Sequence, residues 1–151
     1  MKHELMLTRH IAAPRAALYR AWTEPELLKQ WFTPRPWTTP VVELDVRPGG
    51  ANYILMRGPD GEEFPNRGVY LEVVPNERLV FTDAYVNSAW EPAEKPFMTG
   101  IITFADEGAG TRYTARALHW SEADRETHEQ MGFHEGWDKA TDQLEALLRG
   151  A

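Results

Sequence analysis

Histidines near the end of the chain are the residues whose types and spacing first suggest metal or acid/base chemistry. His128 and Glu129 match the start of the zinc-protease pattern H-E-x-x-H, but the second histidine position holds Gly132. His134 comes six residues after His128, roughly 240° around a helix, so the two imidazoles cannot bind one ion. The chain has no cysteine, which excludes thiolate metal sites and a cysteine nucleophile. We therefore expect no metal site.

A second pair, His134 and Asp138, has the spacing of neighbours on one helix face and could act as a metal-binding or acid/base pair. Pairs at this spacing arise often on exposed helix surfaces, where they contribute little. We favour the simpler interpretation, in which the two side chains form a surface pair without chemistry.

His119 closes a predicted strand over residues 112–119. Alternation places His119 on one side of this strand with Tyr113, Ala115 and Ala117, where the small alanines leave space. His119 would then contact a ligand near the start of the following helix. The alternative is that it caps that helix or lies half-exposed at a rim.

Opposite charges on two other predicted strands could meet in one pocket. Asp83 shares a side with Phe81 and Tyr85, and Arg57 shares a side with Tyr53. A carboxylate on an apolar face has a raised pKa or a partner, and Arg57 is the partner we consider. The alternative is that the strand ends turn both charges into water.

Aromatic side chains are more informative as a group. Six tryptophans, six phenylalanines and five tyrosines exceed what a core of this size requires, while Gly100, Gly132 and Gly136 suggest an incompletely filled interior. Trp37 and Trp90 lie in irregular, proline-containing loops, where an aromatic side chain can line or cover the mouth of a cavity. The candidate ligand-binding residues are Trp37, Arg57, Phe81, Asp83, Tyr85, Trp90, Phe104, Tyr113, His119, Phe133 and Trp137.

The sequence contains no pattern typical of a common enzyme or cofactor site. It has no G-x-S-x-G, no phosphate-binding loop and no dinucleotide fingerprint, and no helix follows Gly49-Gly50 to hold a phosphate. We therefore predict no catalytic residue and no cofactor. Whether the protein is an enzyme stays open.

The stretch 121–149 is the element that would position much of this cavity. Ser121 and Asp124 have the S/T-x-x-D/E spacing of a helix start. Phe133, Trp137 and Leu144 then fall on one side of a 3.6-residue period. This pattern predicts one long helix, stable only against a large apolar surface, with a bend or close approach at its glycines.

The residues before this helix predict a sheet. Residues 4–11 alternate as a first strand, and two short helices then meet at Thr23, which forms a second capping pair with Glu26. We predict an α+β fold in a single domain over residues 1–151, with a curved antiparallel sheet of six or seven strands around the long C-terminal helix. The remaining strands are predicted over residues 41–46, 52–56, 68–74, 78–86, 99–104 and 112–119.

Composition excludes several classes of partner. The chain has 151 residues and a net charge of -7, so the phosphates of nucleic acids and anionic lipids would be repelled on average. The first residues lack an apolar signal-peptide core, and no apolar run approaches the length of a membrane span. We expect no nucleic-acid partner, no membrane insertion and a cytoplasmic location.

Short segments distributed along nearly the whole chain resemble a known family. They occur in the family's order and are Ala12-Ala13-Pro14, Ala21-Trp22-Thr23-Glu24-Pro25-Glu26, Gln30-Trp31-Phe32, Asp45-Val46-Arg47-Pro48-Gly49-Gly50, Gly68-Val69-Tyr70, Pro75-Asn76-Glu77-Arg78-Leu79-Val80-Phe81-Thr82 and Gly136-Trp137. The family is that of the activator of heat-shock-protein-90 ATPase homologues.

This resemblance implies the helix-grip fold shared with START-type lipid-transfer domains, birch-pollen-allergen-like proteins and bacterial polyketide cyclases. That fold commonly encloses an apolar cavity between the sheet and the C-terminal helix. The eukaryotic members of the family stimulate a chaperone ATPase with an additional N-terminal domain, which has no counterpart in these residues.

Three functions follow as hypotheses. The first is binding of a small apolar or aromatic ligand between sheet and helix. The second is a cyclase or hydrolase activity in the same cavity, which requires two titratable groups that converge. The third is docking on a chaperone or another protein through an exposed apolar surface. A homodimer is compatible with each of them.

Overall fold

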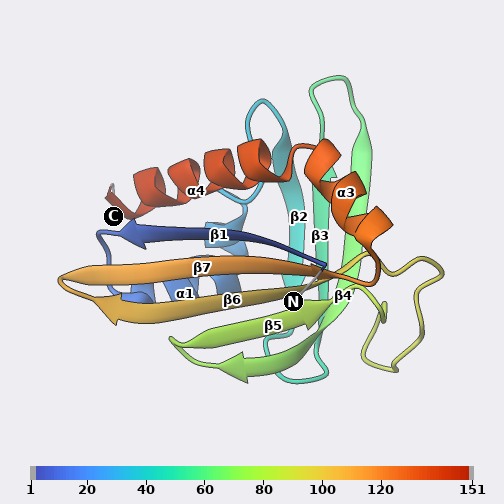
Figure 1. Ribbon diagram of the computed structural model, residues 1–151, viewed down its shortest axis with the longest axis horizontal. Helices are drawn as coiled ribbons and strands as arrows, with labels where there is room; N and C mark the ends of the chain where they lie inside the picture. The colour runs from blue at the N-terminus through green and yellow to red at the C-terminus, as the bar shows by residue number, and fades with distance from the viewer. Residues whose placement is uncertain (1–2, 150–151) are drawn as a thin grey trace.

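One curved antiparallel sheet organises the computed structural model, which describes residues 3–149 (Figure 1). Within this range seven strands lie in the order β1-β7-β6-β5-β4-β3-β2, so the first strand pairs with the last and every other neighbour is consecutive in sequence. The strands are β1 (Glu4–Ile11), β2 (Thr38–Leu44), β3 (Ala51–Arg57), β4 (Glu63–Val74), β5 (Arg78–Thr82), β6 (Met98–Glu107) and β7 (Gly110–His119). The predicted α+β architecture is confirmed.

The sheet bends because its two halves run in different directions. In Figure 1, β2 and β3 stand across the direction of β1, β6 and β7, and the long strand β4 lies between the two sets. The pairing of β4 with β5 shifts register between Tyr70 and Glu72. Such bulges increase local twist and let a strand bend.

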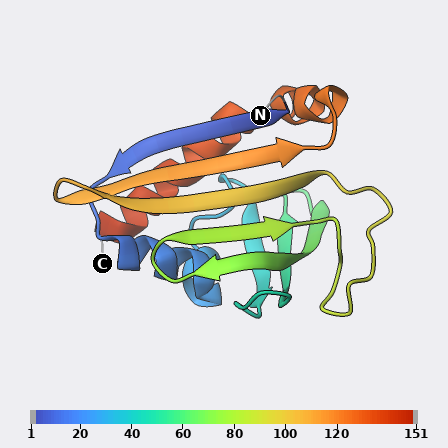
Figure 2. The same cartoon turned by 60° about the horizontal axis from the view of Figure 1, so that its bottom comes forward.

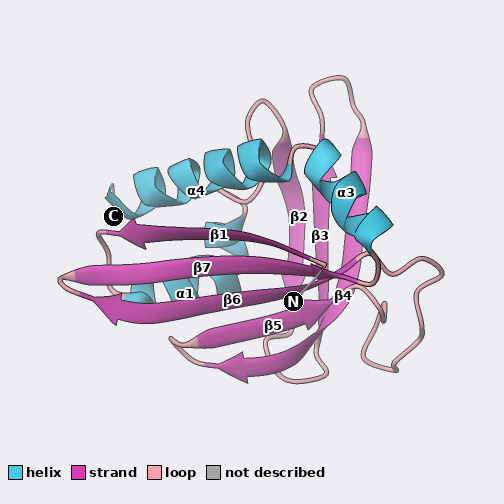
Figure 3. Cartoon of the chain, viewed as in Figure 1, coloured by secondary structure: helices cyan, strands magenta, loops and turns pink. Residues whose placement is uncertain are grey.

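Four helices complete the part of the chain that the structure describes: α1 (Arg15–Thr23), α2 (Pro25–Leu28), α3 (Glu122–Gln130) and α4 (Phe133–Arg149). Figure 2 shows α4 crossing behind β1 and β7, on the same side as α1. Figure 3 shows α3 beside the turn that leaves β7. No helix in residues 3–149 is long and apolar enough to cross a membrane.

The first strand follows the predicted alternation. Leu5, Leu7 and Ile11 are buried, whereas Met6 points outward and is 52% exposed. Arg9 also lies on the inner side, where an unpaired cation would be costly. Its guanidinium donates to Asp142 at 2.6 Å on α4, so this ion pair joins the first strand to the last helix.

The predicted single long helix is instead two helices with a bend between them. The predicted cap of the first is confirmed, since the Ser121 hydroxyl accepts from the Asp124 amide at 3.1 Å. α3 buries none of its residues, and the chain then turns at Gly132 with φ +95°. The apolar stripe begins only at Phe133, so α4 alone has a face that packs on the sheet.

The second predicted capping pair is wrong. The Thr23 hydroxyl donates back to the carbonyl of Tyr19 at 2.7 Å rather than capping the next helix. Glu24 precedes α2 instead, and Pro25 occupies its first turn, where the missing amide hydrogen has no cost.

Strand ends also differ from the predicted ranges. β2 begins at Thr38 and includes Pro40, which is tolerated because β2 is the edge of the sheet. β5 ends at Thr82 rather than residue 86, since the chain leaves the sheet at Asp83. β4 begins five residues before the predicted start, at Glu63.

The core joins the inner face of the sheet to the helices. Leu18 of α1 and Leu144 of α4 are fully buried in the same cluster as Leu79 of β5 and Ile102 of β6. Burying such a side chain contributes about 1.5–3 kcal/mol. The same cluster includes Trp22 and Tyr113, which also line a hollow between sheet and helices.

Candidate ligand-binding cavity

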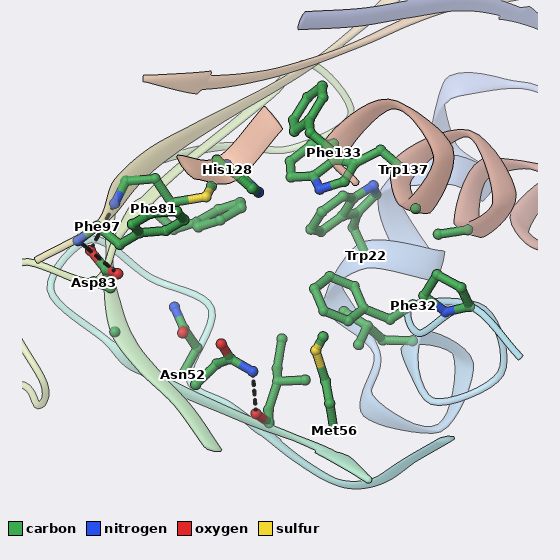
Figure 4. Close-up of a pocket in the computed structure, with 18 of the residues that line it drawn as sticks. Trp22, Phe32, Asn52, Met56, Phe81, Asp83, Phe97, His128, Phe133 and Trp137 are labelled. Carbon is green, nitrogen blue, oxygen red and sulfur yellow. Dashed lines mark hydrogen bonds between the residues drawn. The ribbon is translucent and has the colours of Figure 1, made fainter. Parts of the chain in front are cut away.

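A cavity of about 410 Å³ lies between the inner face of the sheet and the helices α1, α2 and α4 (Figure 4). Its wall is mainly apolar, and residues from β3, β4, β5 and β6 form the opposite side. The aromatic residues of this wall are Trp22, Trp31, Phe32, Tyr70, Phe81, Phe97, Tyr113, Phe133 and Trp137.

The helix side of the wall combines large rings with small residues. Phe133 and Trp137 stack with centroids 4.6 Å apart, while Gly136, Ala140 and Thr141 line the same surface. A Cβ added at Gly136 would meet no atom within 4 Å. The absence of a side chain here therefore leaves open space instead of allowing a close approach between elements.

The other glycines have different roles. Gly100 lies opposite Phe81 in the pairing of β5 with β6, and a Cβ at Gly100 would stand 2.5 Å from the Phe81 ring. Gly100 therefore makes room for that ring and does not enlarge the hollow. Gly132 supplies the positive φ of the bend between α3 and α4.

Two aromatic side chains form a polar contact on the cavity wall. Nε1 of Trp22 donates to the Tyr113 hydroxyl at 3.0 Å in a fully buried position. Burial raises the pKa of Tyr113, since a phenolate would lose its hydration there. Tyr113 is therefore a neutral phenol and not a base.

Asp83 is one titratable group on the wall, placed where the chain leaves β5. Its Oδ1 accepts from the backbone amides of Phe97 at 2.8 Å and Met98 at 3.1 Å. Burial raises the pKa of Asp83, and the hydrogen bonds from Phe97 and Met98 offset part of this rise. The carboxylate thus fixes the end of the 83–97 loop to the start of β6.

His128 of α3 also contributes a titratable group to the wall. Its Nδ1 lies 2.8 Å from Nε2 of His119, and its ring packs on Phe97 with centroids 4.9 Å apart. Burial, together with the neighbouring His119, lowers the pKa of His128 to about 4. The ring is therefore neutral at physiological pH.

Strands β3 and β4 also contribute polar residues to the wall. Asn52, Asn66 and Arg67 line the cavity, and Asn52 pairs with Gly68, which lies beside Thr82 at the end of β5. The Asn66 amide donates to the carbonyl of Ile54 at 3.2 Å, and the Arg67 guanidinium lies 4.2 Å from the centroid of the Tyr53 ring. Both groups thus have contacts within the sheet.

Of the eleven candidate residues named from the sequence, the structure brings five to the wall of this cavity. They are Phe81, Asp83, Tyr113, Phe133 and Trp137. His119 is buried directly behind the wall, in contact with His128.

The remaining candidates lie elsewhere. Trp37 packs on Phe64 with centroids 5.5 Å apart, and Tyr85 packs on Trp90 at 5.3 Å, in a loop on which Trp90 is 47% exposed. Phe104 is buried in the core.

The partnership of Arg57 with Asp83 that we considered does not form, and Arg57 is exposed, as in the alternative. Arg57 donates to Glu63 at 2.7 Å, its direct neighbour across β3 and β4. A cross-strand partner is held close by the backbone register, so it outcompetes a carboxylate several strands away. Similarly, His134 pairs with Glu129 at 3.4 Å and Asp138 with Arg9 at 3.3 Å, so His134 and Asp138 do not form a pair. No group of three or more potential metal ligands occurs within residues 3–149.

Several wall residues are not among the candidates predicted from the sequence. In the sequence, His128 belongs only to an incomplete zinc motif, and Trp22 to a segment that resembles the family. Phe97 lies at the end of an irregular loop, where neither period applies. A signal was present for Trp22, which lies on the apolar face of the short helix α1, whereas Phe32 lies beyond the end of α2.

Solved structures share this fold. A crystal structure of a protein from Nitrosomonas europaea is 46% identical, with a TM-score of 0.93 over 97% of this chain and 94% of that one. A protein from Mycobacterium smegmatis is 29% identical, with a TM-score of 0.82 over 96% and 90%. An AHSA1-like protein from Aeromonas hydrophila is 21% identical and has the same fold, with a TM-score of 0.73 over 95% and 92%.

No curated protein matches the chain. The family model described as Activator of Hsp90 ATPase homolog 1-like protein matches residues 12–149, which is most of the chain and includes every helix that lines the cavity. The match agrees with the sheet order, the C-terminal helix and the segments that resemble this family. The chain therefore belongs to the AHSA1-like family, with the helix-grip fold of START-type proteins.

Proposed function

We propose that this AHSA1-like protein binds a small apolar or aromatic molecule in the cavity between the sheet and α4. The observation that carries the proposal is a hollow of about 410 Å³ lined by aromatic rings, with few polar groups on its wall. Small-molecule sites typically have roughly 300–1,000 Å³ and this kind of lining.

A glycine inside α4 supports the same conclusion, because it lowers the stability of the helix. Glycine in a helix interior is about 1 kcal/mol less favourable than alanine. At Gly136 an added Cβ would meet nothing within 4 Å, so neither packing nor backbone strain requires glycine. Gly136 therefore lowers the stability of the helix at a position where a side chain would enter the hollow. This is expected if the hollow has to stay open for a ligand.

The uncharged fluorescent probe N-phenyl-1-naphthylamine tests the proposal. We expect saturable binding of one probe per chain, with the increase in fluorescence typical of an apolar site. Gly136→Leu places a side chain into the hollow and is expected to weaken binding about tenfold or more, because it occupies the volume the probe needs. Glu135→Leu is the matched control, since Glu135 is the adjacent helix residue and is exposed.

Two results would count against ligand binding. One is that the wild-type protein does not bind the probe and native mass spectrometry of protein from its own host finds no retained molecule. The other is that the Gly136 and Glu135 variants bind the probe equally well, which would place the binding site outside the cavity.

A cyclase-like or hydrolase-like activity is the second candidate, and one observation favours it. Asp83 binds the backbone amide of Phe97 while His128 packs on the ring of the same residue, so two titratable groups lie near one wall residue. Their pKa values are shifted in opposite directions, which is common in acid/base sites. Loss of turnover in both Asp83→Asn and His128→Gln, with probe binding retained, would support this activity.

The other partners stay predictions from the sequence. A chaperone partner would be tested by stimulation of the chaperone's ATPase activity, and a homodimer by analytical sedimentation. The predicted cytoplasmic location would be tested by cell fractionation.

A further inference from the structure

Two histidines beside the cavity, the buried His119 and the partly buried His128, form a hydrogen-bonded chain whose direction can be determined. At one end, Nδ1 of His119 lies 3.1 Å from the backbone carbonyl oxygen of His3. A carbonyl oxygen can only accept, so Nδ1 of His119 carries a proton. In a neutral imidazole the other nitrogen is then a bare acceptor.

The next link follows from the first. Nε2 of His119 lies 2.8 Å from Nδ1 of His128. Since Nε2 of His119 accepts in the neutral ring, Nδ1 of His128 has to donate. The remaining nitrogen of His128, Nε2, is therefore an unprotonated acceptor on the opposite edge of the ring.

This free acceptor belongs to the cavity wall. His128 is one of the lining residues, its ring centroid is 6.3 Å from that of Trp137, and the imidazole reaches into the hollow near Trp137 (Figure 4). No residue between 3 and 149 forms a hydrogen bond with Nε2 of His128. The backbone carbonyl of His3 thus orients an acceptor toward the ligand space through two imidazoles.

We propose that Nε2 of His128 is the hydrogen-bond acceptor that selects the ligand, and that the ligand is an aromatic or apolar molecule carrying a hydroxyl group. This assignment rests on the proposed ligand-binding function and specifies its chemical class. The hydroxyl donates to Nε2 while the apolar body of the ligand lies against the rings of Phe133 and Trp137.

The same end of the cavity disfavours an acidic ligand. Asp83 is the other titratable wall group there, and its carboxylate would repel a second anion. His128 has no proton on Nε2 to offer to an oxyanion. The cation on the described wall, Arg67, places its guanidinium 4.2 Å from the centroid of the Tyr53 ring, and Tyr53 does not line the cavity. A neutral alcohol or phenol is therefore favoured over the corresponding acid.

Three naphthalene derivatives separate these possibilities by isothermal titration calorimetry at about pH 8, above the ordinary pKa of imidazole. 2-Naphthol offers a hydroxyl donor, 2-methoxynaphthalene has no donor and 2-naphthoate is an anion. We expect the wild-type protein to bind 2-naphthol about tenfold more tightly than the methyl ether, as one buried hydrogen bond supplies. We expect 2-naphthoate to bind most weakly.

Two variants at the same position assign the preference to His128. His128→Leu removes the acceptor and is expected to bring the affinity ratio of 2-naphthol to its methyl ether close to one, with the ether bound as before. His128→Gln keeps an amide nitrogen that can donate to His119 and an amide oxygen that can accept in the cavity. It is expected to retain most of the preference.

Nitrogen-15 chemical shifts of the wild-type imidazoles provide a measurement that needs no variant. We expect His128 to show a protonated Nδ1 and a bare Nε2 whose shift changes on addition of 2-naphthol but not of the ether. This measurement tests whether Nε2 of His128 is the acceptor even if His128→Leu does not fold.

The outcomes are distinguishable. If none of the three compounds binds, the proposed ligand-binding function fails. If the compounds bind but 2-naphthol has no advantage, or if His128→Leu keeps that advantage, or if Nε2 of His128 carries the proton, the assignment of the acceptor is overturned and ligand binding stands.

Discussion

Gln143 of α4 donates from its side-chain nitrogen to the backbone carbonyl of Trp31 at 2.9 Å. The same nitrogen donates to the carbonyl of Thr33 at 3.0 Å, and the amide oxygen accepts from the backbone of Arg35 at 3.0 Å. One nearly buried side chain therefore holds the segment after α2, from which Pro34 reaches the cavity wall. These hydrogen bonds join α4 to the segment after α2, whereas the neighbouring contacts of α4 are mainly apolar.

Gln143→Leu is expected to destabilise the protein by about 2–4 kcal/mol, because it leaves buried carbonyls and an amide without partners. Urea unfolding followed by circular dichroism measures the change. Gln130→Leu is the matched control, since Gln130 is exposed at the end of α3. If both variants lose the same stability, the three contacts of Gln143 contribute nothing specific.

Two glycines four residues apart should respond in opposite directions to the same substitution. Gly136→Ala is expected to stabilise by about 1 kcal/mol, since a methyl group fits and helix propensity improves. Gly132→Ala is expected to destabilise by about 1–2 kcal/mol, because φ is +95° there and a Cβ is strained. Thermal unfolding of both variants checks the pair, and an equal sign for the two changes would contradict the assigned roles.

The protein should lose stability in acid through His128. Its folded-state pKa is lowered from 6.5 to about 4, so between these values the unfolded chain binds a proton that the folded chain does not. The stability is therefore complete above about pH 6.5 and is lost as the pH falls toward 4. We expect a loss of about 1–2 kcal/mol, discounted because the ring is only partly buried.

Asp83 acts in the opposite direction. Its folded-state pKa is raised above 3.8, so the folded chain retains a proton that the unfolded chain releases, and stability falls as the pH rises through this range. The His128 contribution is therefore isolated by comparison with His128→Gln, which cannot titrate. The free energy of unfolding of the wild type relative to this variant should increase with pH between 4 and 6.5. A constant difference would rule out a shifted His128.

The contact between Trp22 and Tyr113 should show coupling in a double-mutant cycle. Tyr113→Phe leaves Nε1–H of Trp22 buried without an acceptor and is expected to cost about 1–3 kcal/mol. With Trp22→Phe already in place, that penalty should fall by about 1 kcal/mol, since no donor is left unpaired. Additive effects in urea unfolding would mean that the hydrogen bond contributes nothing beyond packing.

Much of the architecture could be predicted from local patterns. Alternation identified the buried side of the first strand from Leu5, Leu7 and Ile11, and the helical period identified the packing face of α4 from Phe133 and Leu144. Turn residues separated the strands, and consecutive hairpins require an antiparallel sheet. These features are encoded locally because backbone geometry alone sets the periods of two and 3.6 residues.

The set of residues on the cavity wall depends on contacts between distant parts of the chain. The periods of single strands and helices do not predict such contacts. Alternation allows Arg57 and Asp83 to face one pocket, but the backbone register gives Arg57 a nearer partner in Glu63. His119 and His128 meet because the chain turns between β7 and α3, and Phe97 reaches them at the end of an irregular loop.

The amino-acid sequence by itself thus determined the antiparallel sheet, the packing face of the C-terminal helix and the resemblance to the family, but not the break between α3 and α4. The tertiary structure alone decided which polar groups converge on the hollow and which find partners elsewhere. The physical reason is that burial patterns follow from the repeat of each element, whereas convergence depends on the paths of loops and on the bend at Gly132.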